Sequence, residues 1–415
     1  MTPSMPAPVA LHFHSNPFIK QAVIHALRLL VTTVFIFCFS KSVSADSHIA
    51  RTSSNITHIN KTVATDAVIN LPVVKLEQTR PLAQTVQRID DTRLVLVGET
   101  HTRYDHHLIQ LEVLKLLYQK SPKLALGVEW FQQPFQKNLD AYIAGEMSEE
   151  EMLHQTGYFE RWRYDYRLYR PIMQYARAHK IPVIALNASQ ELTDVLSESG
   201  FDDITTELKT QLPESYDWSD KAYEKRLRDV FDEHPEYPGD FEGFLRVQIT
   251  WDESMAERAA QYLKKNPENR LLIFAGSGHI MFDSGIPNRI KRRIDVEPLS
   301  ILVSEDLLPA SENIADFLVL SAAQTLQPAG LIGALLETKG KLVTIKGFSD
   351  NSAVKDAGVE KGAVIIKVDN ETVESFADFK LAIMDKKPGD SVELHYLENA
   401  QAGNKAIKSV NLELR

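Results

Sequence analysis

Short apolar runs that alternate with longer amphipathic stretches restrict the fold of this chain more than any other feature. The amphipathic stretches at 106–120 and 167–179 place apolar residues at helical spacing. The short runs between them are almost uninterrupted apolar sequence, as in strands that are buried on both faces. These runs lie at 93–97 (RLVLV), 124–128 (LALGV), 181–186 (IPVIAL), 271–274 (LLIF) and 299–303. The alternation predicts an α/β domain, with a mostly parallel sheet and helices on both of its faces.

The chain has 415 residues, which is too long for one ordinary domain, and its formal net charge is −10. No basic field covers it, so we expect no nucleic-acid partner. Changes in composition and in the pattern of apolar residues along the chain predict five segments. They are a signal peptide at 1–45, a linker at 46–75, the α/β domain at 76–305, a helical connector at 306–325 and a small β-rich domain at 326–415.

The N-terminus has the three-part pattern of a secretory signal. The apolar run at 29–39 follows basic residues, is too short to span a bilayer comfortably, and precedes the small-x-small sequence at 43–45. We expect cleavage before Asp46 and export to the periplasm or cell envelope, with an uncleaved anchor as the alternative. Cys38, the only cysteine, lies within the run, so the mature chain has no thiol for a disulfide, metal site or nucleophile.

Polar side chains follow four of the expected strands. Glu99 and His101 come after the first, Glu129 after the second, Asn187 after the third and His279 after the fourth. Ligands of open parallel sheets bind outside the carboxyl ends of the strands. We therefore expect these side chains to share one edge of the sheet. Taken singly, each has a plainer interpretation, such as a polar turn or a helix cap.

Two of these strand ends share the form Gly-x-x-His, at 98–101 and 276–279. Glycine allows unusual backbone angles or close backbone approach, so a following histidine can project over the sheet edge. Two imidazoles with carboxylates suit a divalent transition metal or general acid–base chemistry. The candidate catalytic residues are Glu99, His101, Glu129 and His279, and the candidate metal ligands are His101, Glu129 and His279.

A second cluster, at 158–169 (YFERWRYDYRLY), is dense in aromatic residues and arginine. It is either the surface face of an amphipathic helix or a lip that grips an aromatic or anionic ligand. Asp252 either caps a helix or reaches the site. The candidate residues for binding a cofactor are Tyr158, Arg163, Tyr164, Tyr166 and Asp252.

These motifs resemble the ChaN-type domain, the haem-binding uptake branch of the Tiki/erythromycin-esterase-like superfamily. The similar segments are 98–101, 128–131, 162–165, 251–256 and 276–279, and the resemblance covers about 76–300. It implies an α/β fold with haem, or a divalent transition metal, at the strand ends. His101 and His279 match the two motif histidines, and Glu99 and Glu129 match the acidic positions. The family implicates a tyrosine as haem ligand, which no motif places here.

The C-terminal segment resembles a PDZ domain of the bacterial HtrA-like arrangement. Residues 351–359 and 361–365 match its short helix, glycine turn and strand. The resemblance implies a carboxylate-binding loop where a peptide C-terminus is captured and the peptide adds as a strand. A PDZ domain used only for packing is the alternative. The candidate loop residues are Leu331, Ile332, Gly333 and Ala334.

The sequence therefore leaves two functions open, and whether the protein is an enzyme stays undecided. One is an exported haem-binding protein of iron or haem uptake, whose PDZ domain recruits peptides or proteins. The other is a metal-dependent hydrolase, a peptidase or esterase, whose PDZ domain captures substrate C-termini. A non-catalytic scaffold has no support beyond the PDZ domain. The ChaN branch is known for a lipoprotein signal that this chain lacks, so membrane association stays open.

Overall fold

The computed structural model describes most of the chain beyond residue 76. The described residues are 77, 79–89, 92–235, 239–305, 313–398 and 406–415. The expected signal peptide and linker lie outside them. Among the described helices, none combines the length and the apolar character that crossing a membrane requires.

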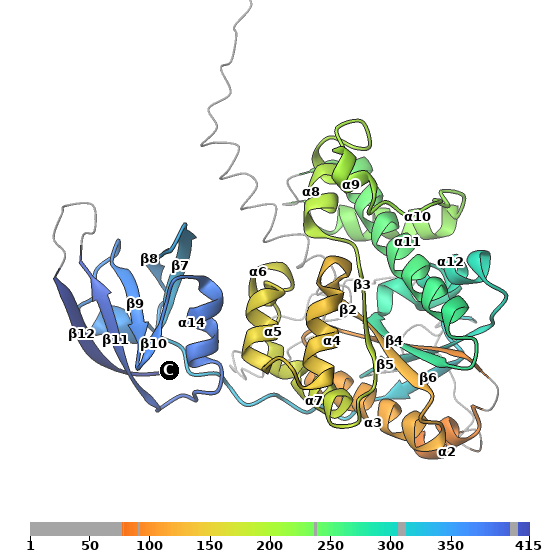
Figure 1. Ribbon diagram of the computed structural model, residues 1–415, viewed down its shortest axis with the longest axis horizontal. Coiled ribbons are helices and arrows are strands. Elements are labelled where there is room, and N and C mark those ends of the chain that lie inside the picture. Colours follow the sequence, from red (N-terminus) through yellow and green to blue (C-terminus); the bar gives the residue numbers. More distant parts are fainter. Residues whose placement is uncertain (1–76, 78, 90–91, 236–238, 306–312, 399–405) are drawn as a thin grey trace, which may run out of the picture.

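A six-stranded sheet with parallel neighbours throughout forms the centre of the first domain, in the order β3-β2-β4-β1-β5-β6 (Figure 1). The four apolar runs that precede the candidate site residues occupy the four adjacent positions β3, β2, β4 and β1, so their carboxyl ends share one edge. The strands are β1 (Leu94–Glu99), β2 (Leu124–Gln132), β3 (Val183–Asn187), β4 (Arg270–Gly276), β5 (Pro298–Ser304) and β6 (Phe317–Leu320).

Helices cover both faces of this sheet, as the alternation predicts. Successive strand residues point to opposite faces, so Val95 and Val97 pack in one apolar core while Leu94 and Leu96 pack in the other. The first core is covered by α2 (Leu82–Gln87), α3 (Tyr104–Lys120), α4 (Gln136–Ala144), α5 (Glu149–Gln155), α6 (Tyr158–Arg161) and α7 (Arg170–Ala178). The second is covered mainly by α11 (Phe241–Lys265) and α12 (Ile286–Arg293). The fold class is confirmed.

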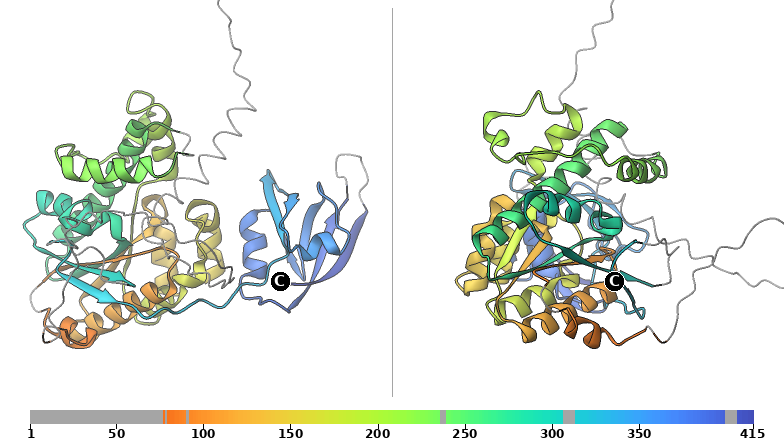
Figure 2. Two further views of the ribbon diagram at one scale, coloured as in Figure 1. Left: turned by 180° about the vertical axis from the view of Figure 1, so that it is seen from behind. Right: turned by 90° about the vertical axis from the view of Figure 1, so that its right-hand side faces the viewer.

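A smaller helical layer stands beyond the carboxyl ends of the strands (Figure 2). It comprises α8 (Gln190–Glu198), α9 (Thr206–Lys209), α10 (Lys221–Asp232) and the start of α11. Asp240 caps α11, because its carboxylate accepts from the N–H of Gly243 at 2.7 Å. Asp252 therefore lies in the middle of α11, and the interpretation of Asp252 as a cap is wrong.

The connector between the two domains also differs from expectation. A helix was expected at 306–325, but its described part contains strand β6, which pairs in parallel with β5. The sequence Phe317-Leu318-Val319-Leu320 is apolar and partly β-branched, and the open edge of β5 offers it a ladder of hydrogen bonds. Tertiary pairing thus decides the conformation of this short segment.

The C-terminal domain is an antiparallel sheet, in the order β12-β11-β9-β8-β7, with two helices. Its elements are β7 (Ala334–Lys339), β8 (Leu342–Phe348), α13 (Ala353–Asp356), β9 (Val364–Val368), β10 (Glu371–Thr372), α14 (Phe376–Ile383), β11 (Ser391–Leu397) and β12 (Ile407–Glu413). Strand β7 is at the edge of the sheet and begins at Ala334, the last of the candidate loop residues. In that loop Gly333 has a φ of +74°, and a Cβ there would lie 2.5 Å from the Cα of Ser352, so only glycine fits.

Helix α14 attaches this domain to the first one, beside α5 and α6 (Figure 1). Ala377 and Met384 of α14 are buried in the first domain's core cluster. Arg170 forms an ion pair with Asp385, and the His154 imidazole lies 3.1 Å from the carboxylate of Asp378. The PDZ-like helix therefore rests against the segment that carries the aromatic cluster.

Candidate functional site

His101 follows strand β1 and is 7% exposed. Its Nδ1 lies 2.5 Å from Oε1 of Glu99, the last residue of the strand. The rings of Trp162 and Tyr164 each stand 5.0 Å from the imidazole, centroid to centroid. Carboxylate and aromatic walls together fix the ring, and its Nε2 faces the space in front of the sheet edge.

His279 occupies the equivalent place after strand β4, in a 3₁₀ turn at Ser277–His279, and is 1% exposed. Its Nδ1 lies 2.6 Å from Oδ1 of Asp252 on α11. The hydroxyl of Tyr223 on α10 donates to Oδ2 of the same carboxylate at 2.6 Å. Asp252 therefore reaches the site by holding His279.

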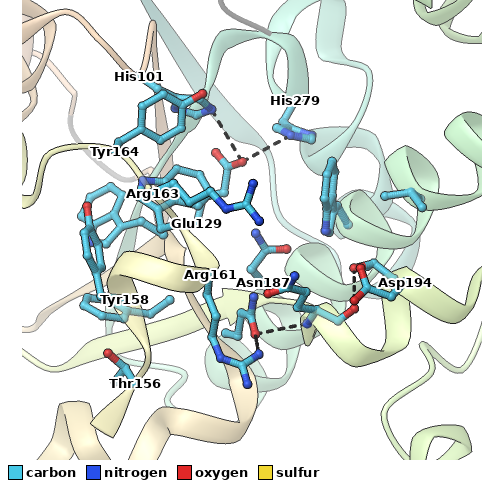
Figure 3. A pocket seen from close by; sticks show the side chains of 18 of the residues that line it. His101, Glu129, Thr156, Tyr158, Arg161, Arg163, Tyr164, Asn187, Asp194 and His279 are labelled. Atoms are coloured by element: carbon cyan, nitrogen blue, oxygen red, sulfur yellow. Dashed lines mark hydrogen bonds and ion pairs between the residues drawn. The ribbon is translucent and has the colours of Figure 1, made fainter. Parts of the chain in front are cut away.

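Glu129 lies between the two imidazoles (Figure 3). Its Oε1 is 3.5 Å from Nε2 of His279 and 4.0 Å from Nε2 of His101. Its Oε2 accepts from the N–H of Gly276 at 2.7 Å. The structure thus brings together Glu99, His101, Glu129 and His279, as expected from strand ends at one sheet edge.

The buried imidazoles and carboxylates of this site shift one another's pKa values. Burial opposes protonation of His279, but Asp252 and Glu129 outweigh it and raise the pKa of His279 to about 10. Burial likewise opposes a raised pKa for His101, and Glu99 and Glu129 again prevail. Burial would raise the pKa of Glu129, yet the two imidazoles lower it to about 2. These shifts favour charged imidazoles around a charged carboxylate.

Gly276 allows the backbone to pass close to the ring of His101. A Cβ there would lie 3.0 Å from Cε1 of His101, and one at Gly98 would lie 2.6 Å from a methyl of Leu302. Gly276 has an ordinary φ of −56°. Gly276 is therefore needed because a side chain there would crowd His101. Its backbone adopts an angle that any residue could adopt.

A pocket of about 100 Å³ opens in front of these groups, and we call it the histidine pocket. His101, Glu129 and His279 line it together with Asn187, which is 6% exposed at the end of β3. Ser189, not Asn187, caps the following helix. The remaining lining used below is Tyr158, Arg161, Trp162, Arg163, Tyr164 and Trp251.

The aromatic cluster forms one side of the histidine pocket. Tyr158, Arg163 and Tyr164 line it, whereas the hydroxyl of Tyr166 points away and donates to Glu149 at 3.2 Å. Burial raises the pKa of Tyr158 and of Tyr164 above the usual range. Arg163 has a φ of +69°, a left-handed conformation that is uncommon outside glycine and frequent at functional sites. The structure brings three of the four predicted cluster residues to the site and leaves Tyr166 outside it.

Sequence reasoning missed several residues of this site. Arg161 and Trp162 belong to the aromatic cluster that the sequence marked, and Trp251 directly precedes Asp252, so all three were within reach. Tyr223 gave no signal, because its role depends on α10 packing beside α11.

One ligand atom each from Glu99, His101 and Glu129 lies within 4.8 Å of the others, which is close enough for a metal ion. Oε1 of Glu99 is already held by Nδ1 of His101. His279, a predicted metal ligand, is not part of this group, although its Nε2 lies 3.5 Å and that of His101 4.0 Å from Oε1 of Glu129.

Comparison with known proteins gives the same two units. Residues 85–290 match the family model described as haem-binding uptake, Tiki superfamily, ChaN, and residues 330–414 match the PDZ domain model. No curated protein matches the chain.

Among solved structures, the chain is similar to ChaN of Campylobacter jejuni, reported with cofacial haem. The identity is 14% over 58% of this chain and 92% of that one, with a TM-score of 0.47. It is also similar to the PDZ domain of a carboxy-terminal protease from Vibrio cholerae in complex with peptide. There the identity is 20% over 21% of this chain and 93% of that one, with a TM-score of 0.18.

The family matches agree with the strand-end site of the first domain and the small antiparallel sheet of the second. Residues 85–290 therefore form a ChaN-type haem-binding domain of the Tiki superfamily, and residues 330–414 form a PDZ domain.

Proposed function

We propose that this protein is exported, binds haem at the histidine pocket and serves in iron or haem uptake. The observation that carries the proposal is the pocket itself, where two imidazole Nε2 atoms and the aromatic and arginine side chains of 158–164 face one space. Export is supported by the N-terminal sequence pattern alone.

The donor chemistry of the pocket fits haem. The imidazoles offer Nε2 to iron, and Trp162 and Tyr164 offer flat apolar faces. Arg161 and Arg163 suit the carboxylates of propionates. Bound haem would supply an iron centre that accepts a nitrogen or oxygen ligand.

The size of the histidine pocket limits this fit. About 100 Å³ is well below the roughly 300 Å³ at which small-molecule sites begin, so haem cannot enter it entirely. Its residues can hold only the part of the macrocycle that faces the mouth. The pKa values of Tyr158, Tyr164 and both imidazoles are raised, so each of these side chains would have to release a proton to bind iron.

Haem titration of the purified full chain, followed by absorbance, tests this function. We expect a saturable Soret shift that is lost in the double variant His101→Ala/His279→Ala. His179→Ala is the matched control, because His179 is exposed at the C-terminal end of α7 and does not line the histidine pocket. Equal titrations of wild type and double variant would show that haem binds elsewhere. Intact-mass analysis of the exported protein should give a chain that begins near Asp46.

The PDZ domain supports a second binding activity, for peptide C-termini. Strand β7 is an edge strand beside α14, and it begins at Ala334, after the glycine-dependent residues 331–333. The N–H of Leu331 already donates to the carbonyl of Arg415 at 2.9 Å, so capture would depend on later amides of the loop. Peptides with a free C-terminus should bind the full chain, and amidated versions should bind at least tenfold more weakly.

A metal-dependent hydrolase is the second candidate, favoured by the convergence of both Nε2 atoms on Oε1 of Glu129. A carboxylate holds each Nδ1, the usual arrangement behind metal-bound imidazoles. A bound divalent ion would supply Lewis acidity. Glu99 and Asp252 would keep both rings oriented, and the site would have to release protons, because the pKa of each imidazole is raised.

Metal analysis of the same preparation separates the two candidates. Under the second, the chain should retain about one divalent ion, which both His101→Ala and His279→Ala remove and His179→Ala keeps. A preparation that binds neither haem nor metal would overturn both functions and leave the PDZ domain as the active part.

A further inference from the structure

A second cavity, of about 260 Å³, lies beneath helix α10, and we call it the α10 cavity. His101 lines both this cavity and the histidine pocket, whereas Glu129 and His279 line only the histidine pocket. The functions proposed above use the histidine pocket, so the larger space beside His101 has no role in them.

The walls of the α10 cavity are mainly apolar. Tyr223, Leu227 and Val230 repeat at helical spacing and present one face of α10. Gly276 contributes backbone without a side chain, and Met281 adds a flexible thioether. Apolar cavities of about 150 Å³ already bind molecules of the size of benzene, so the α10 cavity has room for a short aliphatic group.

The two ionisable side chains that this cavity shares with the strand-end site bind each other. Nδ1 of His101 lies 2.5 Å from Oε1 of Glu99, and the second carboxylate oxygen, Oε2, has almost no accessible surface. Thr100 and Ser277 add neutral hydroxyls to the lining. This part of the wall therefore presents neutral groups and a pair of charges that already neutralise each other.

The other charged side chains of the lining are bound to neighbours or lie at the rim. Arg226 donates to Oγ of Ser284 at 2.6 Å, and Asp229 accepts from Lys225 at 2.7 Å. Glu233 is exposed at the C-terminal end of α10. A charged ligand would therefore lose its hydration without gaining a counter-charge, whereas an uncharged apolar group avoids that cost.

We propose that the α10 cavity binds an uncharged aliphatic group of about four to six carbons. The group would pack against Leu227, Val230 and Met281, with the ring of His101 beside it. The inference goes beyond the proposed function, because it assigns a ligand to a space outside the histidine pocket. A small free alcohol and the side chain of an apolar residue share this chemistry.

Titration of the full chain with n-pentanol at pH 7, without haem or metal, tests the proposal directly. The readout is the methyl NMR signal of Met281, assigned by its loss in Met281→Leu, because Met281 lines the α10 cavity and not the histidine pocket. We expect a saturable shift with a Kd of about 1 mM, as the burial of about five carbons predicts.

Chain length and charge make the test specific on the wild-type protein. Each methylene removed, from n-pentanol through n-butanol to n-propanol, should weaken binding about fourfold. Butyrate and protonated n-butylamine should bind about tenfold more weakly than n-butanol, or not at all. Nα-acetyl-norleucine amide carries the same butyl group and distinguishes the sources. Binding at least as tight as that of n-butanol points to apolar side chains, and exclusion points to free small molecules.

Two tryptophan variants locate the binding site. Val230→Trp should abolish binding of n-pentanol by filling the cavity. Ala222→Trp places the same side chain on the exposed side of α10, outside the cavity, and should bind as wild type does. Thermal melting shows whether each variant is folded, and the chain-length series decides the matter even if Val230→Trp does not fold.

Four results would each overturn the proposal. They are a Met281 signal that n-pentanol does not shift saturably, an affinity that does not change with chain length, tighter binding of either charged analogue than of n-butanol, and wild-type affinity in folded Val230→Trp. The outcome is independent of the haem and metal titrations, which address the histidine pocket. A failed haem titration therefore leaves the alcohol result intact, and a failed alcohol titration leaves the proposed function intact.

Discussion

The two motif histidines have similar surroundings in the sequence but are held by different parts of the fold. His101 is bound by Glu99, two residues earlier in the same strand-end motif. His279 is bound by Asp252 in the middle of α11, and Asp252 is in turn bound by Tyr223 of α10. The carboxylate that binds the first ring thus comes from the same motif, whereas the carboxylate that binds the second comes from a separate helix that a further helix supports.

The two carboxylates that hold the imidazoles, Glu99 and Asp252, also differ in how many of their oxygens are hydrogen-bonded. Asp252 is fully buried with a partner on each oxygen, whereas Glu99 has one oxygen without a hydrogen bond among the described residues. His101 also lines two cavities and His279 only one. We call His101 and Glu99 the His101 branch, and His279, Asp252 and Tyr223 the His279 branch. We infer that the His279 branch contributes more to stability and that the His101 branch is the more exposed to ligands.

The largest expected effect tests whether Glu129 joins the two branches. Glu129→Ala removes the charge between the imidazoles and the acceptor of the Gly276 N–H, and should lower the free energy of unfolding by about 3–5 kcal/mol. Urea denaturation at pH 7 measures it. Glu150→Ala, an exposed carboxylate on α5, should change stability by less than about 0.5 kcal/mol. A loss below about 1 kcal/mol in Glu129→Ala would mean that the branches are independent.

The pH dependence of stability is the next effect in size. Because the pKa of His279 is raised to about 10, its contribution is complete below the unfolded value near 6.5 and is lost as the pH rises toward 10. Glu129 has its pKa lowered to about 2, so its contribution is present above about 4.5 and is lost as the pH falls toward 2. Stability should fall by up to about 1.4 kcal/mol per pH unit above pH 7.

The pH profile of Asp252→Asn provides the control for that assignment. Without the Asp252 charge, the pKa of His279 should fall, so the alkaline loss should still begin near pH 6.5 but should end at a lower pH and be smaller. An alkaline slope that is the same in both proteins would assign the loss to other groups.

The sequence predicts the parts of the site that lie within one motif or at neighbouring strand ends, and it does not predict partners that separate helices bring in. The residues at the strand ends were predictable, because a parallel sheet brings the carboxyl ends of adjacent strands to one edge. Glu99, the partner of His101, was also predictable, because it lies two residues earlier in the same motif. Tyr223 was not, because nothing in α10 indicates that it packs over Asp252. Strand β6 was also missed, since its four apolar residues are too few to distinguish a strand from a helix without the pairing with β5.

The two orienting carboxylates offer the sharpest direct comparison. Asp252→Asn should cost about 2–3 kcal/mol, because it removes a fully buried charge bonded to His279 and Tyr223. Glu99→Gln should cost about 1 kcal/mol, because only one of its oxygens is hydrogen-bonded. Urea denaturation of both variants at pH 7 tests the ranking. The reverse order would contradict the idea that the His279 branch is the more strongly held.

The smallest effect concerns the outermost member of the His279 branch. Tyr223→Phe removes the donor to Oδ2 of Asp252 and should cost about 1 kcal/mol. Tyr158→Phe is the matched control, because the hydroxyl of Tyr158 is buried yet has no hydrogen-bond partner within the described chain, so its removal should be neutral or slightly stabilising.

With one donor fewer, the Asp252 carboxylate becomes a stronger acceptor for Nδ1 of His279. The imidazole NMR signals of His279 should therefore shift in Tyr223→Phe while those of His101 stay in place, since Tyr223 reaches the site only through Asp252. A shift of equal size at both histidines would show that the two branches are one network.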